Sequence, residues 1–286
     1  MPDLRADRTP MASDHDRDAT PHPPAAAAAP AHSSERTAAP ALSVIIPALN
    51  ESTRLPPYLA SIRTYMDSHY GGAYELIVVD DGSTDTMPSI LVTAARDWPQ
   101  LHTIRHAVNR GKGAAVRTGV AAAKGACLLY ADADGATPIA EENRLRRAID
   151  AGADIAVGSR LLGAKDVVRR RTWHRSLIGR AFATVARQVV PVSVRDTQCG
   201  FKMLRTEAGH DLFRRSREDG YLFDIEILAL ARQLKYNVVE VAINWSDQPG
   251  SQLNLRRQAL RVFGDLWRVR RHLRQTRSSR ESGNRN

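Results

Sequence analysis

The chain has 286 residues, 43% of them hydrophobic and 25% charged, and its formal net charge is +10. This length and composition indicate a globular protein with one large α/β domain or two small ones. Its two cysteines, Cys127 and Cys199, lack metal-type spacing, which excludes a disulfide framework and indicates a reducing compartment and two core thiols. The basic excess predicts an anionic partner: a nucleic acid, a membrane surface or a phosphorylated substrate.

Residues 1–40 are rich in Ala, Pro, Asp and Arg and have almost no large apolar side chains. Such a segment buries too little surface to offset the entropy that it loses on ordering, so we predict disorder over 1–40. Its acidic beginning does not match a secretory signal, and the chain has no apolar run of roughly eighteen residues. We therefore expect a cytoplasmic protein without a membrane span.

Strands and helices are predicted to alternate from Leu42 onward. Apolar, β-branched runs predict strands within 42–51, 74–85, 101–107, 127–134 and 153–160. Helices are expected through 55–66, from near 83–85, within 111–125 and over 140–150. This alternation predicts parallel βαβ units, in which ligands bind beyond the carboxyl ends of the strands.

Polar residues follow four of these predicted strands. They are Asn50 with Glu51, Asp80 with Asp81, Asp132 with Asp134, and Ser159 with Arg160. Because the carboxyl ends of parallel strands meet at one edge of a sheet, we expect these side chains to converge there. This convergence favours a functional site more strongly than any one motif does.

Asp132 and Asp134 end the run CLLYADAD at i and i+2, so they share one face of the strand. Such a pair often only caps a helix. Two adjacent anions repel one another unless a cation lies between them, and Mg²⁺ and Mn²⁺ favour carboxylate and phosphate oxygens. The pair therefore predicts a divalent metal ion that holds a diphosphate.

Two further motifs each allow a structural and a functional interpretation. VVDDGSTD is a turn with a helix cap, yet Asp80 and Asp81 exceed what a cap needs, so a carboxylate here is a candidate partner for a base or ribose. GKGAAVRTG is neither a Walker loop nor a dinucleotide fingerprint. Its glycines are consistent with close packing alone, while Lys112 at the start of a helix is a candidate phosphate ligand.

Six segments in order resemble the inverting nucleotide-sugar glycosyltransferases of family 2. They are VIIPALNE, VVDDGSTD, NRGKGAAVRTG, ADADGATP, GSR and DTQCGFK. DADGAT, DTQCGFK and FDIEIL are most similar to the dolichyl-phosphate β-glucosyltransferase branch. The resemblance covers about Leu42 to Leu255, and it implies a GT-A α/β fold with a mostly parallel central sheet flanked by helices.

The resemblance implies a role for each matching residue. Pro47, Asn50 and Glu51 would line the base and ribose of a UDP-sugar, Val79 and Asp81 would bind the base edge, and Lys112 would meet phosphate. Asp132 and Asp134 match the metal motif for Mg²⁺ or Mn²⁺, with Ala133 beside the ribose. Arg160 and Arg175 resemble arginines that grip the donor diphosphate or an acceptor phosphate, and Asp196 would lie near the reacting centre, unless it only caps the turn before Cys199.

Two positions depart from the family pattern. Ala136 stands where mannosyl relatives have a glutamine ligand, so Thr137 or water would have to complete the metal site. Gln252, in GSQL, stands where a lysine is expected, so Arg256 or Arg257 would have to supply that positive charge.

A basic amphipathic helix is predicted over 251–275. Leu255, Val262, Leu266, Val269 and Leu273 recur at helical spacing, Phe263 and Trp267 flank them, and ten arginines lie within 253–286. Three interpretations stay open: a helix packed on the domain, an interfacial helix on anionic lipid, or a nucleic-acid-binding tail, for which no motif is found.

The sequence thus predicts a GT-A domain over 41–250, the basic helix over 251–275 and a disordered tail over 276–286. The predicted activity is transfer of glucose, with inversion, from UDP-glucose to a polyprenyl phosphate at the cytoplasmic face of a membrane. The alternatives are another donor such as GDP-mannose, a soluble acceptor, or a non-catalytic basic protein that binds membrane or nucleic acid on the same scaffold.

Overall fold

The computed structural model describes residues 39–164, 167–170, 190, 192–248 and 264–276. All of them belong to one compact unit, Ala38–Asn286. The expectations for 1–38, Arg175, Gln252, Leu255, Val262, Phe263 and 277–286 lie outside the described residues.

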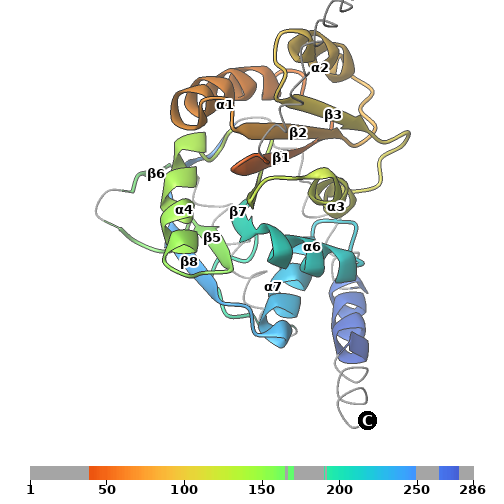
Figure 1. Cartoon of the computed structure of the whole chain (residues 1–286). Helices are drawn as coiled ribbons and strands as arrows, with labels where there is room; N and C mark the ends of the chain where they lie inside the picture. The colour runs from red at the N-terminus through yellow and green to blue at the C-terminus, as the bar shows by residue number, and fades with distance from the viewer. Residues whose placement is uncertain (1–38, 165–166, 171–189, 191, 249–263, 277–286) are drawn as a thin grey trace, which may run out of the picture. The chain divides into compact units, whose positions relative to one another are not determined.

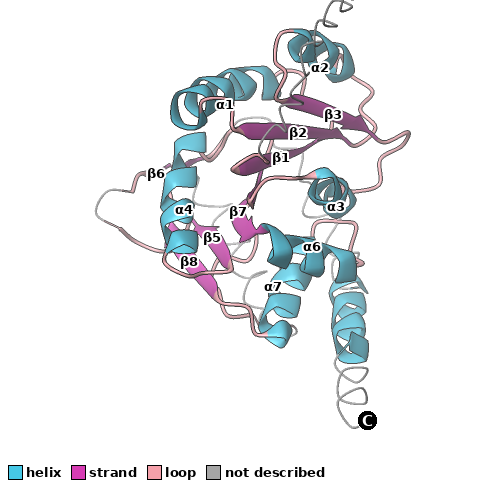
Figure 2. Cartoon of the chain, viewed as in Figure 1, coloured by secondary structure: helices cyan, strands magenta, loops and turns pink. Residues whose placement is uncertain are grey.

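A seven-stranded sheet forms the centre of this unit (Figures 1 and 2), with the strand order β3-β2-β1-β4-β7-β5-β8. The strands are β1 (Leu42–Ala48), β2 (Tyr74–Asp80), β3 (Leu101–Arg105), β4 (Cys127–Ala131), β5 (Ile155–Ser159), β7 (Phe201–Arg205) and β8 (Val238–Ala242). Every pairing is parallel except those of β7, which runs antiparallel to both β4 and β5. The predicted mostly parallel α/β sheet is therefore confirmed.

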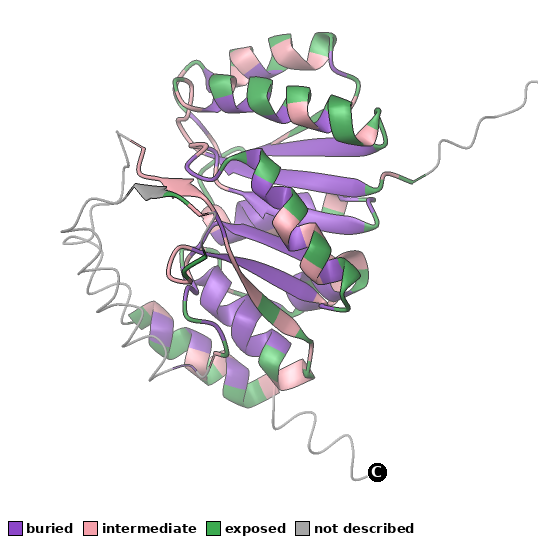
Figure 3. Ribbon diagram, turned by 90° about the vertical axis from the view of Figure 1, so that its left-hand side faces the viewer, coloured by how far each residue is buried: buried purple, intermediate pink, exposed green. Residues whose placement is uncertain are grey.

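Helices cover both faces of the sheet and bury two apolar clusters. The helices are α1 (Leu55–Tyr70), α2 (Met87–Arg96), α3 (Lys112–Ala122), η1 (Ile139–Glu141), α4 (Glu142–Asp150), α6 (Thr206–Arg215) and α7 (Phe223–Leu234). One cluster joins α1, α2 and α4 to alternate residues of the central strands, such as Val44 and Ile46 of β1. The other joins α3, α6 and α7 to the intervening residues, such as Ile45. The inner parallel strands β1, β2, β4 and β5 are consequently buried on both faces (Figure 3), as parallel strands between helix layers must be, whereas the edge strands β3 and β8 are partly exposed.

The start of α2 lies later than predicted, at Met87 instead of near Ser83–Asp85. The amide of Ser83 donates to Asp80 Oδ1 at 2.8 Å, and the amide of Thr84 donates to Asn50 Oδ1 at 2.8 Å. These bonds hold the segment in a loop that joins the ends of β1 and β2.

A short second sheet pairs β6 (Arg169–Arg170) with β9 (Trp245–Ser246). The Asn244 side chain accepts from the amide of Val168 at 2.7 Å and donates to Glu141 at 2.6 Å. This small sheet thereby borders the segment that follows β4, where Ser246 donates its amide to the carbonyl of Ala136 at 2.9 Å.

The C-terminal helix over residues 264–276 packs on the domain. Leu266, Val269 and Leu273 are at most 4% exposed and belong to the same cluster as α6 and α7. Gln233 of α7 donates to the carbonyl of Leu273 at 3.1 Å. The predicted apolar face is therefore used for packing in the described helix, as the first of the three interpretations expects. Within the described residues, no helix is both long and apolar enough to cross a bilayer.

Candidate active site

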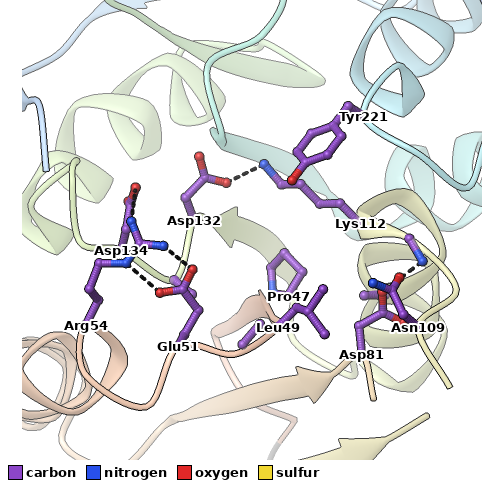
Figure 4. Close-up of a pocket in the computed structure, with 14 residues that line it drawn as sticks. Pro47, Leu49, Glu51, Arg54, Asp81, Asn109, Lys112, Asp132, Asp134 and Tyr221 are labelled. Carbon is purple, nitrogen blue, oxygen red and sulfur yellow. Dashed lines mark hydrogen bonds and ion pairs between the residues drawn. The ribbon is translucent and has the colours of Figure 1, made fainter. Parts of the chain in front are cut away.

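A cavity of about 240 Å³ lies at the carboxyl ends of β1, β2 and β4 (Figure 4). It is lined by Pro47, Ala48, Leu49, Glu51, Arg54, Asp81, Asn109, Gly111, Lys112, Ala115, Asp132, Ala133, Asp134 and Tyr221. Seven predicted nucleotide-binding residues are among them: Pro47, Glu51, Asp81, Lys112, Asp132, Ala133 and Asp134. The predicted convergence of strand ends is confirmed for β1, β2 and β4.

Each carboxylate of the Asp132/Asp134 pair faces a different side-chain cation. Lys112 Nζ lies 2.5 Å from Asp132 Oδ1, and Arg54 Nη1 lies 3.8 Å from Asp134 Oδ2. Burial and the negative charge of Asp132 raise the pKa of Asp134 above its usual range. The two carboxylates thus repel one another inside a partly enclosed site, which is the electrostatic setting that attracts a cation.

Lys112 is the first residue of α3 and reaches across the cavity to Asp132. Burial alone would lower the pKa of Lys112, but the charges of Asp132 and Asp224 raise it above its usual range, so the ammonium stays charged. The N-terminus of α3 adds its own partial positive charge at the same point. The cavity therefore offers anion-binding groups beside the carboxylate pair.

Glycines hold the start of α3 against the loop before α7. A Cβ on Gly111 would lie 2.3 Å from the carbonyl oxygen of Asp219, and Gly111 also has a φ of +105°. A Cβ on Gly113 would lie 2.4 Å from the carbonyl oxygen of Glu218. The packing interpretation of GKG is confirmed, and this packing brings Tyr221 to the cavity wall.

Gly200 makes room for the carboxylate of Asp132. A Cβ on Gly200 would lie 2.1 Å from both oxygens of Asp132, and the Asp132 amide donates to the Gly200 carbonyl at 2.9 Å. The segment DTQCGFK therefore contacts the DAD segment directly, although 68 positions separate the two residues.

Asp81 is buried, and protein donors already occupy most of its carboxylate. Oδ1 accepts from the amide of Arg110 at 3.0 Å and bonds to His106 Nδ1 at 2.7 Å, and Oδ2 accepts from the amide of Gly111 at 2.8 Å. A carboxylate has about four acceptor positions, so about one remains for a ligand. Asp81 mainly shapes the loop that leads into α3.

Glu51 and Arg54 form an ion pair in the turn between β1 and α1. Arg54 Nε donates to Glu51 Oε2 at 2.7 Å, and Arg54 Nη2 donates to Glu51 Oε1. Burial raises the pKa of Glu51, while the charge of Arg54 opposes that rise. The pair closes one end of the cavity beside Asp134 (Figure 4).

Arg160 and Asp196 form a second, bidentate pair, which does not line this cavity. Asp196 Oδ2 accepts from Nε and from the backbone amide of Arg160, and Asp196 Oδ1 accepts from Arg160 Nη2, each at 2.8 Å. Burial would raise the pKa of Asp196, but these bonds and the charge of Arg160 lower it below its usual range. The Arg160 guanidinium also lies 5.6 Å from the centre of the Trp245 ring. Asp196 thereby stays ionised and fixes the orientation of Arg160.

Two of the residues predicted to bind the nucleotide also do not line the cavity. Val79 is fully buried in the core beneath α3, and Asn50 has its side chain turned to the amide of Thr84. Asn50 also has a φ of +54°, which asparagine tolerates better than most residues and which turns the chain sharply after β1. Both residues therefore act on the site through the backbone that they support.

Three polar or aromatic side chains of the cavity are absent from the predicted site residues: Arg54, Asn109 and Tyr221. Arg54 carries a local signal, because it follows Glu51 by three positions just before a helix. Tyr221 carries none, since only the packing of the α6–α7 loop against Gly111 and Gly113 brings it there. Within the described residues, no third His, Cys, Asp or Glu joins the carboxylate pair in a metal-ligand cluster.

The model of a family described as glycosyl transferase family 2 matches residues 43–213. The chain belongs to glycosyltransferase family 2. Among the relatives of this transferase, the dolichyl-phosphate beta-glucosyltransferase of Drosophila melanogaster is 35% identical over 240 residues, covering 80% of this chain and 74% of the relative. That of Homo sapiens is 33% identical over 224 residues, covering 74% and 69%. The predicted family resemblance is confirmed.

Solved structures share the fold of this family 2 transferase. Glucosyl-3-phosphoglycerate synthase from Mycobacterium tuberculosis, crystallised with UDP, superimposes with a TM-score of 0.60 at 20% identity, covering 82% of this chain and 80% of that one. The same synthase with Mn²⁺, UDP-glucose and phosphoglyceric acid gives a TM-score of 0.59 at 19% identity, covering 82% and 80%. The predicted GT-A fold is confirmed.

Proposed function

We propose that this transferase moves glucose, with inversion, from UDP-glucose to a polyprenyl phosphate. The observation that carries the proposal is the carboxylate pair Asp132/Asp134 beside Lys112, inside a cavity at the carboxyl ends of the parallel strands. That arrangement suits a nucleoside diphosphate. The choice of glucose and of a polyprenyl acceptor rests on the names of relatives that are up to 35% identical.

Asp132 and Asp134 fit a bound Mg²⁺ or Mn²⁺. They supply hard oxygen donors, and Mg²⁺ commonly takes one or two protein carboxylates together with phosphate oxygens. Ala136 has no side-chain ligand to add, and its amide donates to Asp134 Oδ1 at 3.0 Å, which fixes that carboxylate. When bound, the ion would act as a Lewis acid that stabilises the diphosphate leaving group.

The remaining cavity residues orient the donor. Lys112 and the start of α3 would bind diphosphate oxygens, and Arg54 would add positive charge from the opposite wall. Asp81 holds the loop at Arg110 and Gly111 that would face the base. The nucleotide would thus be held between two cationic groups and one preformed loop.

A phosphate acceptor has to be positioned for attack, and it does not need a general base to remove a proton. A phosphate monoester has a second pKa of about 6 and is largely ionised at neutral pH. Asp196 is bound to Arg160 through three hydrogen bonds, which makes it a poor proton acceptor. We assign Arg160 to the acceptor phosphate and Asp196 to its orientation, and Arg175 stays a proposed second phosphate ligand.

The test is a transfer assay with purified full-length protein. Radiolabelled UDP-glucose, UDP-galactose, UDP-N-acetylglucosamine and GDP-mannose are offered separately, with Mn²⁺ and a polyprenyl phosphate in detergent. We expect label in the lipid phase mainly from UDP-glucose, as a β-linked phosphodiester, because one in-line displacement inverts the α-linked donor. Asp132→Asn should lose transfer, while Asp97→Asn, an exposed carboxylate on the loop after α2, should retain it.

Each alternative has its own result in this assay. Transfer from GDP-mannose would overturn the sugar and keep the mechanism. Label only in a water-soluble phosphate acceptor would overturn the polyprenyl acceptor. Absence of transfer from every donor, with UDP still bound, would support a binding protein on a transferase scaffold.

A further inference from the structure

Arginines surround the exposed side of the C-terminal helix over residues 264–276. One hollow beside it is lined by Arg214, Arg215 and Arg217 together with residues of the helix, and a second is lined by Trp267, Arg270, Arg271 and Arg274. These seven residues are called the basic surface below. The face of the helix that carries Leu266, Val269 and Leu273 is buried, so the basic surface lies on the side that packing leaves open.

The charge of the basic surface is only partly neutralised. Asp211 pairs with Arg214 at 2.8 Å and with Arg215 at 3.0 Å. Arg217 and Arg271 are exposed, and neither has an acidic partner within the described part of the chain. Their positive charge is therefore available to an anionic partner.

Trp267 gives the basic surface an apolar element. Trp267 is 62% exposed, and the Arg270 guanidinium lies 5.6 Å from the centre of the Trp267 ring. An exposed indole beside arginines suits the boundary between lipid headgroups and acyl chains, where the ring is buried and the cations meet phosphates. The basic surface has no second aromatic residue in the described part of the chain, whereas a single-stranded nucleic acid stacks successive bases on several aromatic side chains.

The basic surface adjoins the donor cavity through one short loop. Arg217 belongs to the surface, and Tyr221 lines the cavity four positions later. Four residues span at most about 14 Å. Arg117 of α3 fixes this loop, since its Nη1 lies 2.6 Å from Asp219 Oδ1 and its Nη2 donates to the Glu218 carbonyl at 3.0 Å. A partner on the basic surface would thus lie near the cavity rim.

We propose that the basic surface docks the enzyme on an anionic lipid bilayer, with Trp267 inserted at the headgroup level. The proposal rests on the proposed function, because a polyprenyl phosphate resides in a membrane. Docking in this place brings the rim at Tyr221 close to the lipid that carries the acceptor. The charged face of the helix, and not its apolar face, is the docking face.

Co-sedimentation with vesicles tests the docking. Full-length protein is mixed with vesicles of phosphatidylcholine alone, or with 30 mol% phosphatidylserine, at low and at high salt. We expect binding to the anionic vesicles only, weakening as salt screens the charges. Arg217→Glu with Arg271→Glu should lower the partition coefficient at least about tenfold, because each basic residue near an anionic membrane contributes roughly fivefold.

The matched control is Arg96→Glu with Lys124→Glu, which changes the net charge equally at two other exposed positions. It should bind within about twofold of the unchanged protein. Quenching of tryptophan fluorescence by brominated lipid should fall strongly in Trp267→Phe. Equal loss of binding in both double variants, or quenching that ignores Trp267, would overturn the proposal.

Two further arms separate docking from catalysis and from another partner. The Arg217→Glu/Arg271→Glu variant should transfer normally to a detergent-dispersed acceptor and poorly to one in anionic vesicles. Loss in detergent as well would overturn a docking role. Tight binding of a 20-base-pair DNA duplex without binding to anionic vesicles would assign the surface to nucleic acid and overturn the proposal. Vesicle docking without transfer to any acceptor would instead contradict the proposed function and leave the docking intact.

Discussion

At the scale of single residues, the carboxylate of Asp132 depends on a neighbour that has no side chain. Gly200→Ala would place a methyl group 2.1 Å from both oxygens of Asp132. The carboxylate can rotate away at little cost to the fold, so we expect folding to persist and UDP affinity in Mn²⁺ to fall at least about tenfold, or 1.4 kcal/mol. Titration calorimetry measures this change. Gly163→Ala, where a Cβ meets nothing within 4 Å, should bind UDP normally, and equal affinities in both variants would contradict the assigned role of Asp132.

The Arg160–Asp196 pair predicts a dependence of stability on pH. In the native protein the lowered pKa of Asp196 stabilises the fold at pH values above the pKa of the unfolded state, about 3.9. This stabilisation is lost as the pH falls through the lower pKa of the folded state. Arg160→Met leaves Asp196 buried without its partner, and burial then raises its pKa. The folded variant would hold a proton that the unfolded chain has lost, so its stability falls as the pH rises above about 4.

We therefore expect the stability difference between the native protein and Arg160→Met to widen from pH 4.5 to pH 7, reaching about 3 kcal/mol. Urea unfolding at both pH values measures it. Adding Asp196→Asn to the variant removes the buried charge and should remove the widening. A difference that is the same at both pH values would mean that the pair contributes only packing.

Local sequence motifs predict the charged residues at the centre of the cavity better than the residues that line or support its walls. Asp132, Asp134 and Lys112 belong to local motifs, and the structure brings all three together in the cavity. Tyr221 is brought there by the glycine packing of Gly111 and Gly113, which no local pattern reveals. The family resemblance assigns Asn50 and Val79 to the nucleotide, yet their side chains support the backbone behind the cavity.

At the scale of elements, the sequence pattern predicts the alternating strands and helices from β1 to β5, and β7 and the later elements α6, α7 and β8 are not predicted from it. Strand β7 escapes this pattern, because its five residues follow a segment of loop and pair antiparallel between β4 and β5. Its Lys202 is nevertheless fully buried, donating to Asp224 Oδ1 at 2.5 Å, where Tyr130 donates as well at 2.6 Å. Because lysine is rarely buried without a partner, Lys202 makes a sequence-based prediction place this strand outside the core. Its partners become visible only in the folded structure.

In the C-terminal helix, two adjacent residues lie on opposite faces, one packed and one exposed, and substitutions at them should have different effects on stability. Leu266 is 2% exposed and Trp267 is 62% exposed. Leu266→Ala leaves a cavity among α6, α7 and the helix, so we expect it to lower the free energy of unfolding by about 2–4 kcal/mol. Trp267→Ala should cost less than about 1 kcal/mol, since it loses mainly the contact with Arg270. Urea unfolding at pH 7 checks both variants, and the reverse order of effects would mean that the packed face is assigned wrongly.

At the scale of the whole molecule, every described residue belongs to the compact unit Ala38–Asn286. The first residues of this unit already make hydrogen bonds to neighbouring strands and loops. The amide of Ala41 donates to the carbonyl of Ala73 at 2.8 Å, and the carbonyl of Pro40 accepts from the amide of Ala126 at 2.9 Å. Ser43 is fully buried, and its hydroxyl donates to Glu75 at 2.6 Å and accepts from the amide of Gly125 at 2.8 Å.

A pair of truncations tests this boundary. A protein of residues 38–286 should keep its melting temperature within about 2 °C and its affinity for UDP, because no described contact of the sheet is removed. A protein of residues 45–286 loses only seven more residues, but among them are the first three of β1, which pairs with both β2 and β4. The loss removes pairing at the centre of the sheet and leaves Glu75 buried without its partner Ser43. Together these defects lower the free energy of unfolding by several kcal/mol, which is large compared with the typical total of about 5–15 kcal/mol for a folded domain. Circular dichroism on heating should therefore show a cooperative transition only for the longer protein, and a cooperative transition of equal midpoint in both would place the true boundary inside β1.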